Sequence, residues 1–477
     1  MNKTIIVKNS YILIKGYERC KKLEDCLTAF DNKFKTAVKY KLFLLDEDRQ
    51  LMVIPAGFSL EYLGSLLPDY TIKFSEKTDS FAITSFKMTV PPRDERQERA
   101  GDFLLGIKDY YQLGNSTQKI LALGTSVGKT YCTINYIQQR NVKSLIIVNR
   151  KQIGTQWIDE FLKFTNLKEK DFYVLSGKES IKTIMAKSKT NHKVYIAIHN
   201  TLGNFINDGG DLSKLFQHLG IGIKVYDEAH LCFESMFNID SRTNTMETLY
   251  LSATPTRTNI SEKKVYKNFF NSVPAYGFDE EVEPDEPYIN SYYISYNSNP
   301  STDDQVKAKN FYGFNINRFS SYSFDKKGHI VLPIIHNLVD TMYKKNKKHA
   351  IIVHTLEQVK ILTAYLEEYY DSDDIGLFCG LVKENKLKDE ASKRIIISTD
   401  KMLGYALTIP DLRGLIMTVP TSSEVVIQQV IGRLRNIGKT CYFFLLTDVG
   451  FDSCKKQRTR IKPYIDKKSK KIINTKI

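Results

Sequence analysis

Short runs of apolar, often β-branched residues recur along most of this chain, and segments of helix length separate them. Five runs lie in one stretch, at residues 120–123, 145–148, 194–198, 223–226 and 249–251. Five more lie further along, at residues 350–353, 375–378, 395–397, 414–417 and 443–446. Continuous apolar strands that alternate with helices are typical of a parallel sheet with helices on both faces. The pattern therefore predicts an α/β protein with two parallel-sheet domains in tandem.

The first 90 residues show a different pattern, which predicts a small α+β unit. Apolar stretches at 41–45 and 51–54 flank a polar turn at 46–49, which is the signal of a β-hairpin. Pro91 and Pro92 then mark a boundary, because proline lacks a backbone donor and restricts the residue before it. The acidic stretch 279–287 contains two prolines and interrupts the α/β pattern. We therefore expect a small N-terminal α+β domain at 1–90, a first parallel-sheet domain at 91–278, a linker or insertion at 279–328, a second parallel-sheet domain at 329–453 and a basic C-terminal tail at 454–477.

The composition is that of a globular protein. Hydrophobic residues make up 42% and charged residues 26% of the 477, which excludes a disordered or fibrous chain. No run approaches the roughly 18 apolar residues that would suggest a membrane span, and the N-terminus lacks the apolar core of a signal peptide. Seven scattered cysteines without a C-x-x-C pair indicate reduced thiols. We therefore expect a cytoplasmic protein with no membrane partner and no structural zinc.

The net charge of +15 is concentrated near the C-terminus. Residues 454–477 contain eight lysines, two arginines and one aspartate, so this segment alone carries +9. A basic segment on a basic protein favours a polyanionic partner such as nucleic acid. A solvated chain end explains the same charge without any partner. If nucleic acid binds here, the lysines suited to non-specific phosphate contact are Lys467, Lys468, Lys470 and Lys471.

Residues 123–130 follow an apolar strand and open a helix, which is the context of a phosphate-binding loop. In such a loop the backbone N–H groups hold phosphate oxygens, Lys129 reaches the β- and γ-phosphates, and the Thr130 hydroxyl holds Mg²⁺. The match is imperfect, because Leu123 and Ser126 stand where glycine is usual. An ordinary strand-to-helix turn is the alternative. We assign ATP binding to Thr125, Ser126, Val127, Gly128, Lys129 and Thr130.

Asp227 and Glu228 follow directly on another apolar strand. Two adjacent carboxylates at the C-terminal end of a strand suit metal-dependent phosphate chemistry. Asp227 can anchor Mg²⁺, and Glu228 can polarise the attacking water. A helix N-terminus rich in acidic residues is the alternative. The phosphate loop earlier in the chain favours the catalytic interpretation.

Residues 123–130 and 225–230 resemble the Walker A and DEAH boxes of superfamily 2 helicases, and further segments resemble that family's motifs in order. The matching segments are 144–150 for motif Ia, 252–255 for motif III, 349–355 for motif IV, 398–410 for motif V and 428–435 for motif VI. The resemblance covers roughly residues 90–450. It implies two RecA-like motor domains, ATP and Mg²⁺ as cofactors, and DNA or RNA as the partner.

The resemblance also implies roles for single residues. Gln97 takes the adenine-side position, and Gln429 contacts the γ-phosphate. Arg433 is an arginine finger that reaches the γ-phosphate from the second domain when the domains close. Arg435 is shifted by one from the family's second arginine, which falls on Asn436. The strand-contact positions fall on Asn149, Arg150, Asn200, Thr201, His354, Thr355 and Thr399.

Some positions have a second interpretation or depart from the family pattern. Trp157, the only tryptophan, is expected to pack beside motif Ia rather than to stack on bases. His354 and Thr355 suit either a phosphate contact or a strand-end cap. Thr408 replaces the usual carboxylate of motif V. Since the principal catalytic residues are all present, we expect a working ATPase.

Residues 42–67 are similar to the front domain of phage UvsW-type DNA helicases. This resemblance implies an ATP-dependent DNA helicase or translocase that unwinds or remodels branched DNA in recombination, repair or replication, as a monomer or weak oligomer. Two alternatives stay open. One is an RNA helicase or transcript-release factor on the same motor, and the other is a non-catalytic nucleic-acid-binding protein on a helicase scaffold.

Overall fold

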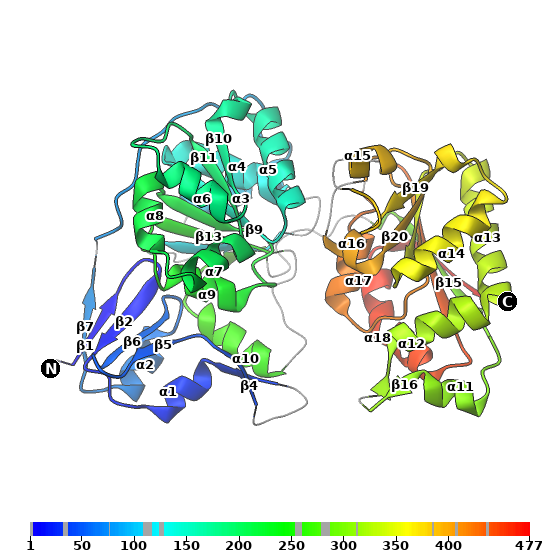
Figure 1. The fold of residues 1–477 in the computed structure, drawn as a ribbon, viewed down its shortest axis with the longest axis horizontal. Helices are drawn as coiled ribbons and strands as arrows, with labels where there is room; N and C mark the ends of the chain where they lie inside the picture. The colour runs from blue at the N-terminus through cyan, green and yellow to red at the C-terminus, as the bar shows by residue number, and fades with distance from the viewer. Residues whose placement is uncertain are drawn as a thin grey trace. The chain divides into compact units, whose positions relative to one another are not determined.

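The chain forms two units, Met1–Val282 and Glu283–Ile477 (Figure 1). Among the described residues, the first unit contains a five-stranded and a seven-stranded sheet, and the second contains another seven-stranded sheet. No helix in these parts of the chain is long and apolar enough to cross a membrane. The computed structural model describes residues 3–31, 37–75, 77–107, 117–123, 128–252, 260–277, 287–311, 313–383, 386–405, 409–435 and 438–477. The positions singled out above that lie outside these ranges are Thr125, Ser126, Val127, Thr408, Asn436 and the motif III residues 253–255.

The N-terminal sheet is mixed, with strand order β5-β6-β2-β1-β7. Its strands are β1 (Thr4–Val7), β2 (Tyr11–Lys15), β5 (Leu44–Asp46), β6 (Leu51–Pro55) and β7 (Thr71–Phe74). β1 and β7 run parallel, and the other neighbours run antiparallel. The predicted hairpin is confirmed, because β5 and β6 pair across residues 47–50. The remaining elements of this part are α1 (Lys21–Cys26), β3 (Thr28–Phe30), β4 (Val38–Lys41) and α2 (Leu60–Leu66).

The larger sheet of the first unit has the order β10-β11-β9-β12-β13-β8-β14, and all neighbouring strands are parallel. Its strands are β8 (Gln118–Leu121), β9 (Ser144–Val148), β10 (Phe172–Leu175), β11 (Val194–Ile198), β12 (Ile223–Tyr226), β13 (Glu247–Leu251) and β14 (Ala275–Tyr276). Its helices are α3 (Glu95–Leu105), α4 (Lys129–Arg140), α5 (Lys151–Phe164), α6 (Lys178–Met185), α7 (His199–Asn207), α8 (Leu212–Leu219), α9 (Phe233–Asp240) and α10 (Ile260–Phe269). The five predicted strands are confirmed, and β10 and β14 are additional edge strands.

Alternate residues of these strands face opposite sides of the sheet. In β9, Leu145 and Ile147 belong to a core that includes residues of α6–α10, whereas Ile146 and Val148 belong to a core with α3–α5. All four side chains are fully buried. The sheet therefore has helices on both faces, which explains why its strands are continuous apolar runs.

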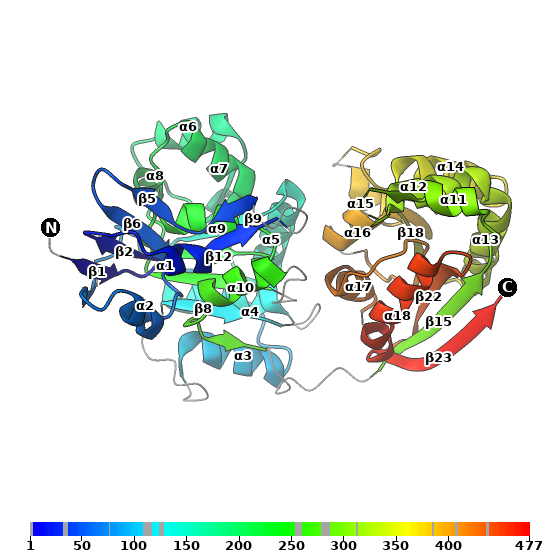
Figure 2. The ribbon, with the colours of Figure 1, turned by 90° about the horizontal axis from the view of Figure 1, so that it is seen from below.

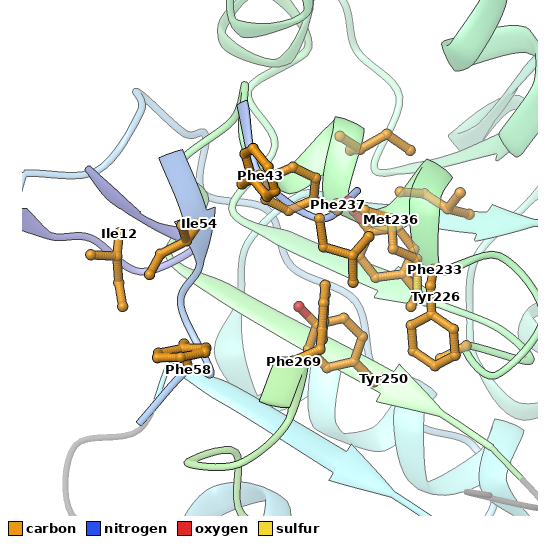
Figure 3. Close-up of a cluster of buried hydrophobic side chains, with 14 of the residues drawn as sticks. Ile12, Phe43, Ile54, Phe58, Tyr226, Phe233, Met236, Phe237, Tyr250 and Phe269 are labelled. Atoms are coloured by element: carbon orange, nitrogen blue, oxygen red, sulfur yellow. Dashed lines mark hydrogen bonds between the residues drawn. The ribbon is translucent and has the colours of Figure 1, made fainter. Parts of the chain in front are cut away.

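The N-terminal sheet packs on the face that α6–α10 cover. Ile12 and Ile54 of the small sheet lie in one cluster with Phe58 and with Phe237 and Phe269 of the larger layer (Figure 3). Each of these side chains is at most 2% exposed. The small sheet and the first parallel sheet thus share one hydrophobic core, and they form one structural unit.

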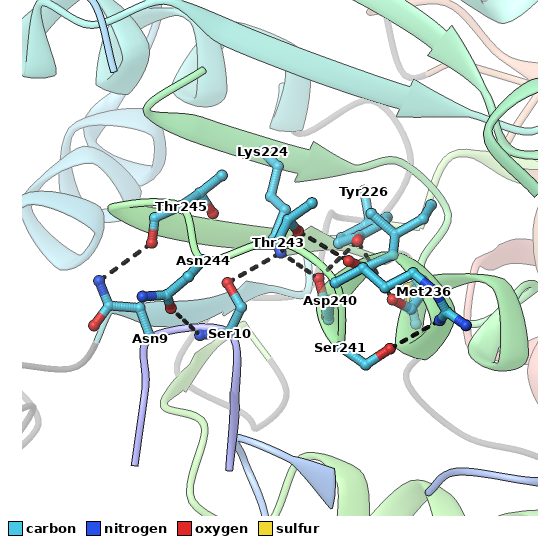
Figure 4. Close-up of polar contacts among 12 residues, drawn as sticks. Asn9, Ser10, Lys224, Tyr226, Met236, Asp240, Ser241, Thr243, Asn244 and Thr245 are labelled. Carbon is cyan, nitrogen blue, oxygen red and sulfur yellow. Dashed lines mark hydrogen bonds and ion pairs between the residues drawn. The ribbon is translucent and has the colours of Figure 1, made fainter. Parts of the chain in front are cut away.

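Polar contacts at the turn between β1 and β2 reinforce this packing (Figure 4). Asn9 Nδ2 donates to the carbonyls of Thr245 and Met246 at 3.2 and 3.1 Å. Lys224 Nζ on β12 donates to Ser10 Oγ at 3.0 Å and forms an ion pair of 2.6 Å with Asp240. Because Lys224 and Asp240 are buried, with side chains 0% and 2% exposed, this pair is shielded from water.

The sheet of the second unit is also parallel throughout, with the order β19-β20-β18-β21-β22-β15-β23. Its strands are β15 (Ile289–Tyr296), β18 (His349–Val353), β19 (Ile375–Phe378), β20 (Ile395–Thr399), β21 (Gly414–Met417), β22 (Cys441–Asp448) and β23 (Ser469–Lys476). Helices α13 (Gly328–Lys344) and α14 (Leu356–Glu367) contribute to one core, and α15 (Leu387–Glu390), α17 (Glu424–Ile431) and α18 (Asp452–Asp466) contribute to the other. The remaining elements are α11 (Thr302–Lys307), β16 (Lys309–Asn310), β17 (Gly313–Phe314), α12 (Ile316–Ser321) and α16 (Asp400–Tyr405).

Two segments of this unit differ from the expectation. The expected linker contains β15, which pairs with both β22 and β23. The expected tail contains α18 and the edge strand β23, as the view from below shows (Figure 2). Ile461 and Ile465 of α18 are each 1% exposed. The basic segment therefore contains an amphipathic helix whose apolar residues are buried. Residues 454–477 are therefore part of the second sheet and its core rather than a tail.

Candidate ATP site and nucleic-acid contacts

The phosphate-loop residues within the described ranges lie after β8 and in the first turn of α4. Gly128 has a backbone φ of +106°, and α4 begins at Lys129. A Cβ atom on residue 128 would meet Gln97 Nε2, the end of a flexible side chain, so the positive φ is what requires glycine here. Lys129 Nζ donates to the Leu123 carbonyl at 2.8 Å. The start of α4 offers backbone N–H groups to an anion, as phosphate binding requires.

Gln97 is brought directly to this loop by α3. The helix begins after Asp94, whose carboxylate accepts the N–H of Gln97. The side-chain Oε1 of Gln97 accepts the N–H of Arg93 at 2.8 Å, and the residue is 5% exposed. Gln97, the adenine-side candidate, and the phosphate loop are therefore neighbours in space, although β8 separates α3 from α4 in the sequence.

Asp227 lies at the carboxyl end of β12, with both carboxylate oxygens hydrogen-bonded. Its Oδ2 accepts the indole N–H of Trp157 at 2.9 Å, and its Oδ1 accepts the N–H of Glu228 at 3.0 Å. Burial and the neighbouring Glu228 raise the pKa of Asp227 to about 6, while Trp157 and Lys129 act in the opposite direction. An Mg²⁺ ion beside this carboxylate would favour its ionised form.

Glu228 has a left-handed backbone, with φ of +49°, which is costly for a residue with a Cβ atom. Its Oε2 is buried and accepts no hydrogen bond from the described residues. The same atom lies 3.3 Å from His230 Nδ1, which in turn lies 3.0 Å from Ser252 Oγ. A strained backbone and an unsatisfied buried oxygen are features that functional sites retain.

These residues fit Mg²⁺ that arrives with a nucleotide. The described residues contain no group of three or more side chains suited to hold a metal by themselves. Mg²⁺ is usually bound by one or two carboxylates together with substrate phosphates and water. Asp227 and the Thr130 hydroxyl are the candidate protein ligands, and the unsatisfied oxygen of Glu228 suits a water molecule.

The strand-contact candidates of the first unit follow β9 and β11. Asn149 and Arg150 come directly after β9, and Asn149 Oδ1 accepts from Cys232 Sγ at 2.8 Å. Asn200 is exposed on α7, where it lines a cavity of about 310 Å³ between α7 and α9. Thr201 is 7% exposed, and its hydroxyl accepts the N–H of Gly177 at 3.0 Å. Thr201 therefore supports a neighbouring turn.

The candidates of motifs IV and V have local structural partners. Thr355 caps α14, where its hydroxyl accepts the N–H of Gln358 at 3.2 Å. Thr399 is 6% exposed and accepts the N–H of Met402 at 3.3 Å. His354 Nδ1 lies 3.0 Å from Asp400 Oδ2. Of the two interpretations of Thr355, the cap is therefore realised.

The motif VI candidates surround the end of α17. Gln429 lies within this helix and is 6% exposed. Arg433 follows the last helical residue in a turn and is partly buried, whereas Arg435 is exposed. Lys467 and Lys468 stand between α18 and β23, and Lys467 is exposed. These basic residues therefore lie in the short connections that follow α17 and α18.

Trp157 is the residue whose contact the sequence interpretation missed. It packs near Phe161, with ring centroids 6.2 Å apart, so the expected packing role is confirmed. It also reaches the acidic motif, because its N–H donates to Asp227. A buried indole N–H usually has an acceptor, and Trp157 is 3% exposed. The need of a buried indole N–H for an acceptor was the only sign of this contact in the sequence, and it does not identify Asp227 as the acceptor.

Sequence comparison finds a family that is similar to part of the first unit. Residues 89–257 match the family described as "Type III restriction enzyme, res subunit". A Haloarcula marismortui protein named DNA 3'-5' helicase Rad25 is 28% identical over 195 residues, which cover 38% of this chain and 29% of that protein. An Acanthamoeba polyphaga mimivirus protein named ATP-dependent RNA helicase L396 is 24% identical over 361 residues, which cover 73% of this chain and 63% of that protein. The chain thus spans less than two thirds of each curated relative.

Solved structures show the same fold. Saccharomyces cerevisiae Dbp5 bound to RNA and ADP BeF3 has a TM-score of 0.54 and 15% identity, covering 80% of this chain and 89% of that one. T4 UvsW aligns over 100% of this chain and 99% of its own, at 17% identity and a TM-score of 0.40. The resemblance to superfamily 2 helicases and the tandem RecA-like architecture are thereby confirmed.

Proposed function

We propose that this protein is an ATP-dependent DNA helicase or translocase of the UvsW type, which unwinds or remodels branched DNA in recombination, repair or replication. The observation that carries the proposal is the grouping of Gln97, Gly128 and Lys129 in the unit that also presents Asp227 and Glu228 at the carboxyl edge of its sheet. The carboxyl edge of a parallel sheet is where such folds bind ligands.

In this proposal each residue has a defined task in ATP hydrolysis. Gln97 reads the adenine edge, Lys129 neutralises the β- and γ-phosphates, and Thr130 and Asp227 hold the metal. Bound Mg²⁺ supplies positive charge to the transferring phosphoryl group. Glu228, which has an unsatisfied buried oxygen, orients the attacking water.

The second unit contributes the groups that make hydrolysis depend on domain closure. Gln429 and Arg433 contact the γ-phosphate only in the closed state, with Arg435 beside them. Charge that develops in the transition state is then stabilised by an arginine finger. Because this arrangement forms and breaks in each cycle, ATP turnover is coupled to domain motion.

In this proposal, polar and basic residues at strand and helix ends of both units bind the nucleic acid. The proposed contacts are Asn149, Arg150, Asn200 and Thr201 in the first unit and His354, Thr355, Thr399, Lys467 and Lys468 in the second. Those whose hydroxyls already cap a turn or helix, as Thr355 does, contribute through the backbone they hold. We further propose a cytoplasmic protein that acts as a monomer or weak oligomer.

A second candidate function is an RNA helicase on the same motor. The relative with the larger coverage, 73% of this chain, carries the name of an RNA helicase. The other relative carries the name of a DNA helicase. Substrate tests therefore have to include RNA.

The deciding experiment is the steady-state ATPase rate with no nucleic acid, single-stranded DNA, duplex DNA, branched DNA and RNA. The Lys129→Ala variant provides the negative control, and Lys163→Ala, at an exposed position of α5, provides the matched one. Stimulation by DNA that Lys129→Ala abolishes and Lys163→Ala retains supports the proposal. Stimulation by RNA alone selects the second candidate, and no turnover with any substrate leaves a binding protein on a helicase scaffold.

A further inference from the structure

We propose that Trp157 is a positioning residue for magnesium, which orients the Asp227 carboxylate so that its remaining lone pairs face the ion of a bound nucleotide. This inference rests on the proposed function, because it concerns the same ATP site. It goes beyond that function by assigning a task to a side chain outside the helicase motifs that hold ATP.

The geometry of Asp227 leaves little freedom. Its backbone N–H donates to the Ile147 carbonyl at 3.0 Å, and its two carboxylate oxygens accept from Glu228 N–H and Trp157 Nε1. An ionised carboxylate has about four acceptor sites, so about two remain for a metal or its water shell. Two hydrogen bonds from opposite ends of the carboxylate fix the plane in which those sites point.

The indole is suited to this task because it can act only as a donor. Histidine and the amide side chains can donate or accept, whereas the Trp Nε1–H only donates. The hydrogen bond of 2.9 Å therefore has one possible direction, and it favours a carboxylate over any neutral acceptor. The contact therefore fixes the orientation of the Asp227 carboxylate.

The position of Trp157 is set by the close approach of α5 to the sheet. A Cβ atom on Gly154 would lie 2.8 Å from Ile196 Cγ2 on β11, so glycine lets the helix lie against the strand. Trp157 is three residues further along the same helix and lies on the same face. Phe161 packs against its ring from the next turn. The close approach of α5 to the sheet and the contact with Phe161 thus fix the position of the indole.

A role in packing alone predicts a different outcome from a role in positioning. Phenylalanine fills most of the indole volume but has no N–H, so packing survives in Trp157→Phe while the hydrogen bond is lost. Phe161→Leu has the reverse effect, since it loosens the same aromatic cluster and leaves the hydrogen bond in place. These two variants form a matched pair.

The first measurement is the magnesium dependence of binding of a fluorescent ATP analogue, with no turnover required. Loss of a side chain that hydrogen-bonds a metal ligand typically costs a metal site about 10- to 100-fold in affinity. We expect the magnesium concentration at half-saturation to rise by about tenfold or more in Trp157→Phe and to change little in Phe161→Leu. Equal magnesium dependence of the wild type and Trp157→Phe would overturn the proposal, as would an equal shift in both variants.

The second measurement needs no variant of Trp157, because this is the only tryptophan of the chain. Its emission should change when MgCl₂ is added to the protein with ADP, and the change should disappear in Asp227→Asn. The proposal would be overturned if the Trp157 emission did not change with magnesium while the fluorescent analogue showed magnesium-dependent binding. A magnesium-dependent signal without ATPase stimulation by DNA or RNA would support it and would overturn the proposed function instead.

Discussion

The two parallel sheets have seven strands each, yet their candidate functional residues are in different physical states. In the first unit, Glu228 has a left-handed backbone and a buried oxygen without a hydrogen bond from the described residues. In the second, Thr355 and Thr399 satisfy helix ends, and His354 contacts Asp400. Strain and unsatisfied polar groups persist where a ligand relieves them. This difference supports the ATP site proposed for the first unit, whereas these residues of the second unit complete its local structure.

The largest expected effect concerns the main exception in the second unit, Arg433. If it acts as an arginine finger, Arg433→Ala should reduce kcat for DNA-stimulated ATP hydrolysis by about 10³-fold or more. Binding of a fluorescent ATP analogue should stay within a factor of about two, because the first unit makes the ground-state contacts. Lys360→Ala, at an exposed position of α14 in the same unit, is the matched control. An equal loss in both variants would mean that the finger cannot be assigned to Arg433.

The next effect is on stability and is confined to the first unit. Asp240→Ala removes the partner of buried Lys224 and the acceptor for the hydroxyls of Tyr226 and Tyr250, 2.7 and 2.8 Å away. Breaking a buried ion pair on one side typically costs about 3–5 kcal/mol. The urea midpoint followed by Trp157 emission should fall accordingly, since that reporter lies in this unit.

Asp208→Ala gives the control for that experiment. The Lys178–Asp208 pair has side chains 62% and 51% exposed, and exposed pairs contribute at most about 1 kcal/mol. Equal destabilisation by both variants would show that the buried network does not tie the N-terminal sheet to the first parallel sheet.

The sequence predicted ten parallel strands correctly because each is buried on both faces and consists of a continuous apolar run. It missed β15, in which Asn290, Ser291 and Ser295 interrupt the apolar and aromatic residues, and β23, which lies at a sheet edge with most side chains exposed. Edge strands bury little side-chain area, so periodicity carries little information about them. The Trp157–Asp227 contact was beyond sequence reasoning for another reason. It joins a helix and a strand end that meet only after the sheet has formed.

A smaller effect is expected on the pH dependence of stability, which one buried histidine in each unit determines in part. Burial lowers the pKa of His199 and of His349 to about 4, against about 6.5 in an unfolded chain. Between these values the unfolded state binds a proton that the folded state does not, so stability falls as the pH drops from about 6.5 towards 4. Above about 6.5 the effect is absent. Each histidine should cost about 2 kcal/mol between pH 7 and pH 5.

The measurement is the urea midpoint of Trp157 emission at pH 7 and pH 5. His199→Gln should reduce the loss on acidification in this unit, and His349→Gln should leave it unchanged. Asp227 acts with the opposite sign, because its raised pKa of about 6 stabilises the folded state as the pH falls. For this reason each variant is compared with the wild type at the same pH. A change caused by His349→Gln alone would contradict the prediction.

The smallest effect tests which unit carries the phosphate contacts. Removing residues 455–477 is unsuitable, because α18 and β23 are part of the second sheet and its core. Single substitutions of a basic residue by glutamine leave α18 and β23 in place. Lys467→Gln lies at the exposed end of α18, and Arg150→Gln lies after β9 in the first unit. Each lost phosphate contact should reduce the slope of log K against log salt for single-stranded DNA by about 0.7.

If both units grip the strand, each variant should lower the slope by this amount, and the double variant should lower it by about twice as much. Lys178→Gln, an exposed lysine paired with Asp208, should leave the slope unchanged and thus controls for net charge. A reduced slope for Arg150→Gln alone would confine the grip to the first unit, and the basic character of residues 454–477 would then serve only to keep the edge strand β23 in water. Edge strands rich in lysine resist pairing with other chains, so that outcome would still give the charge a physical reason.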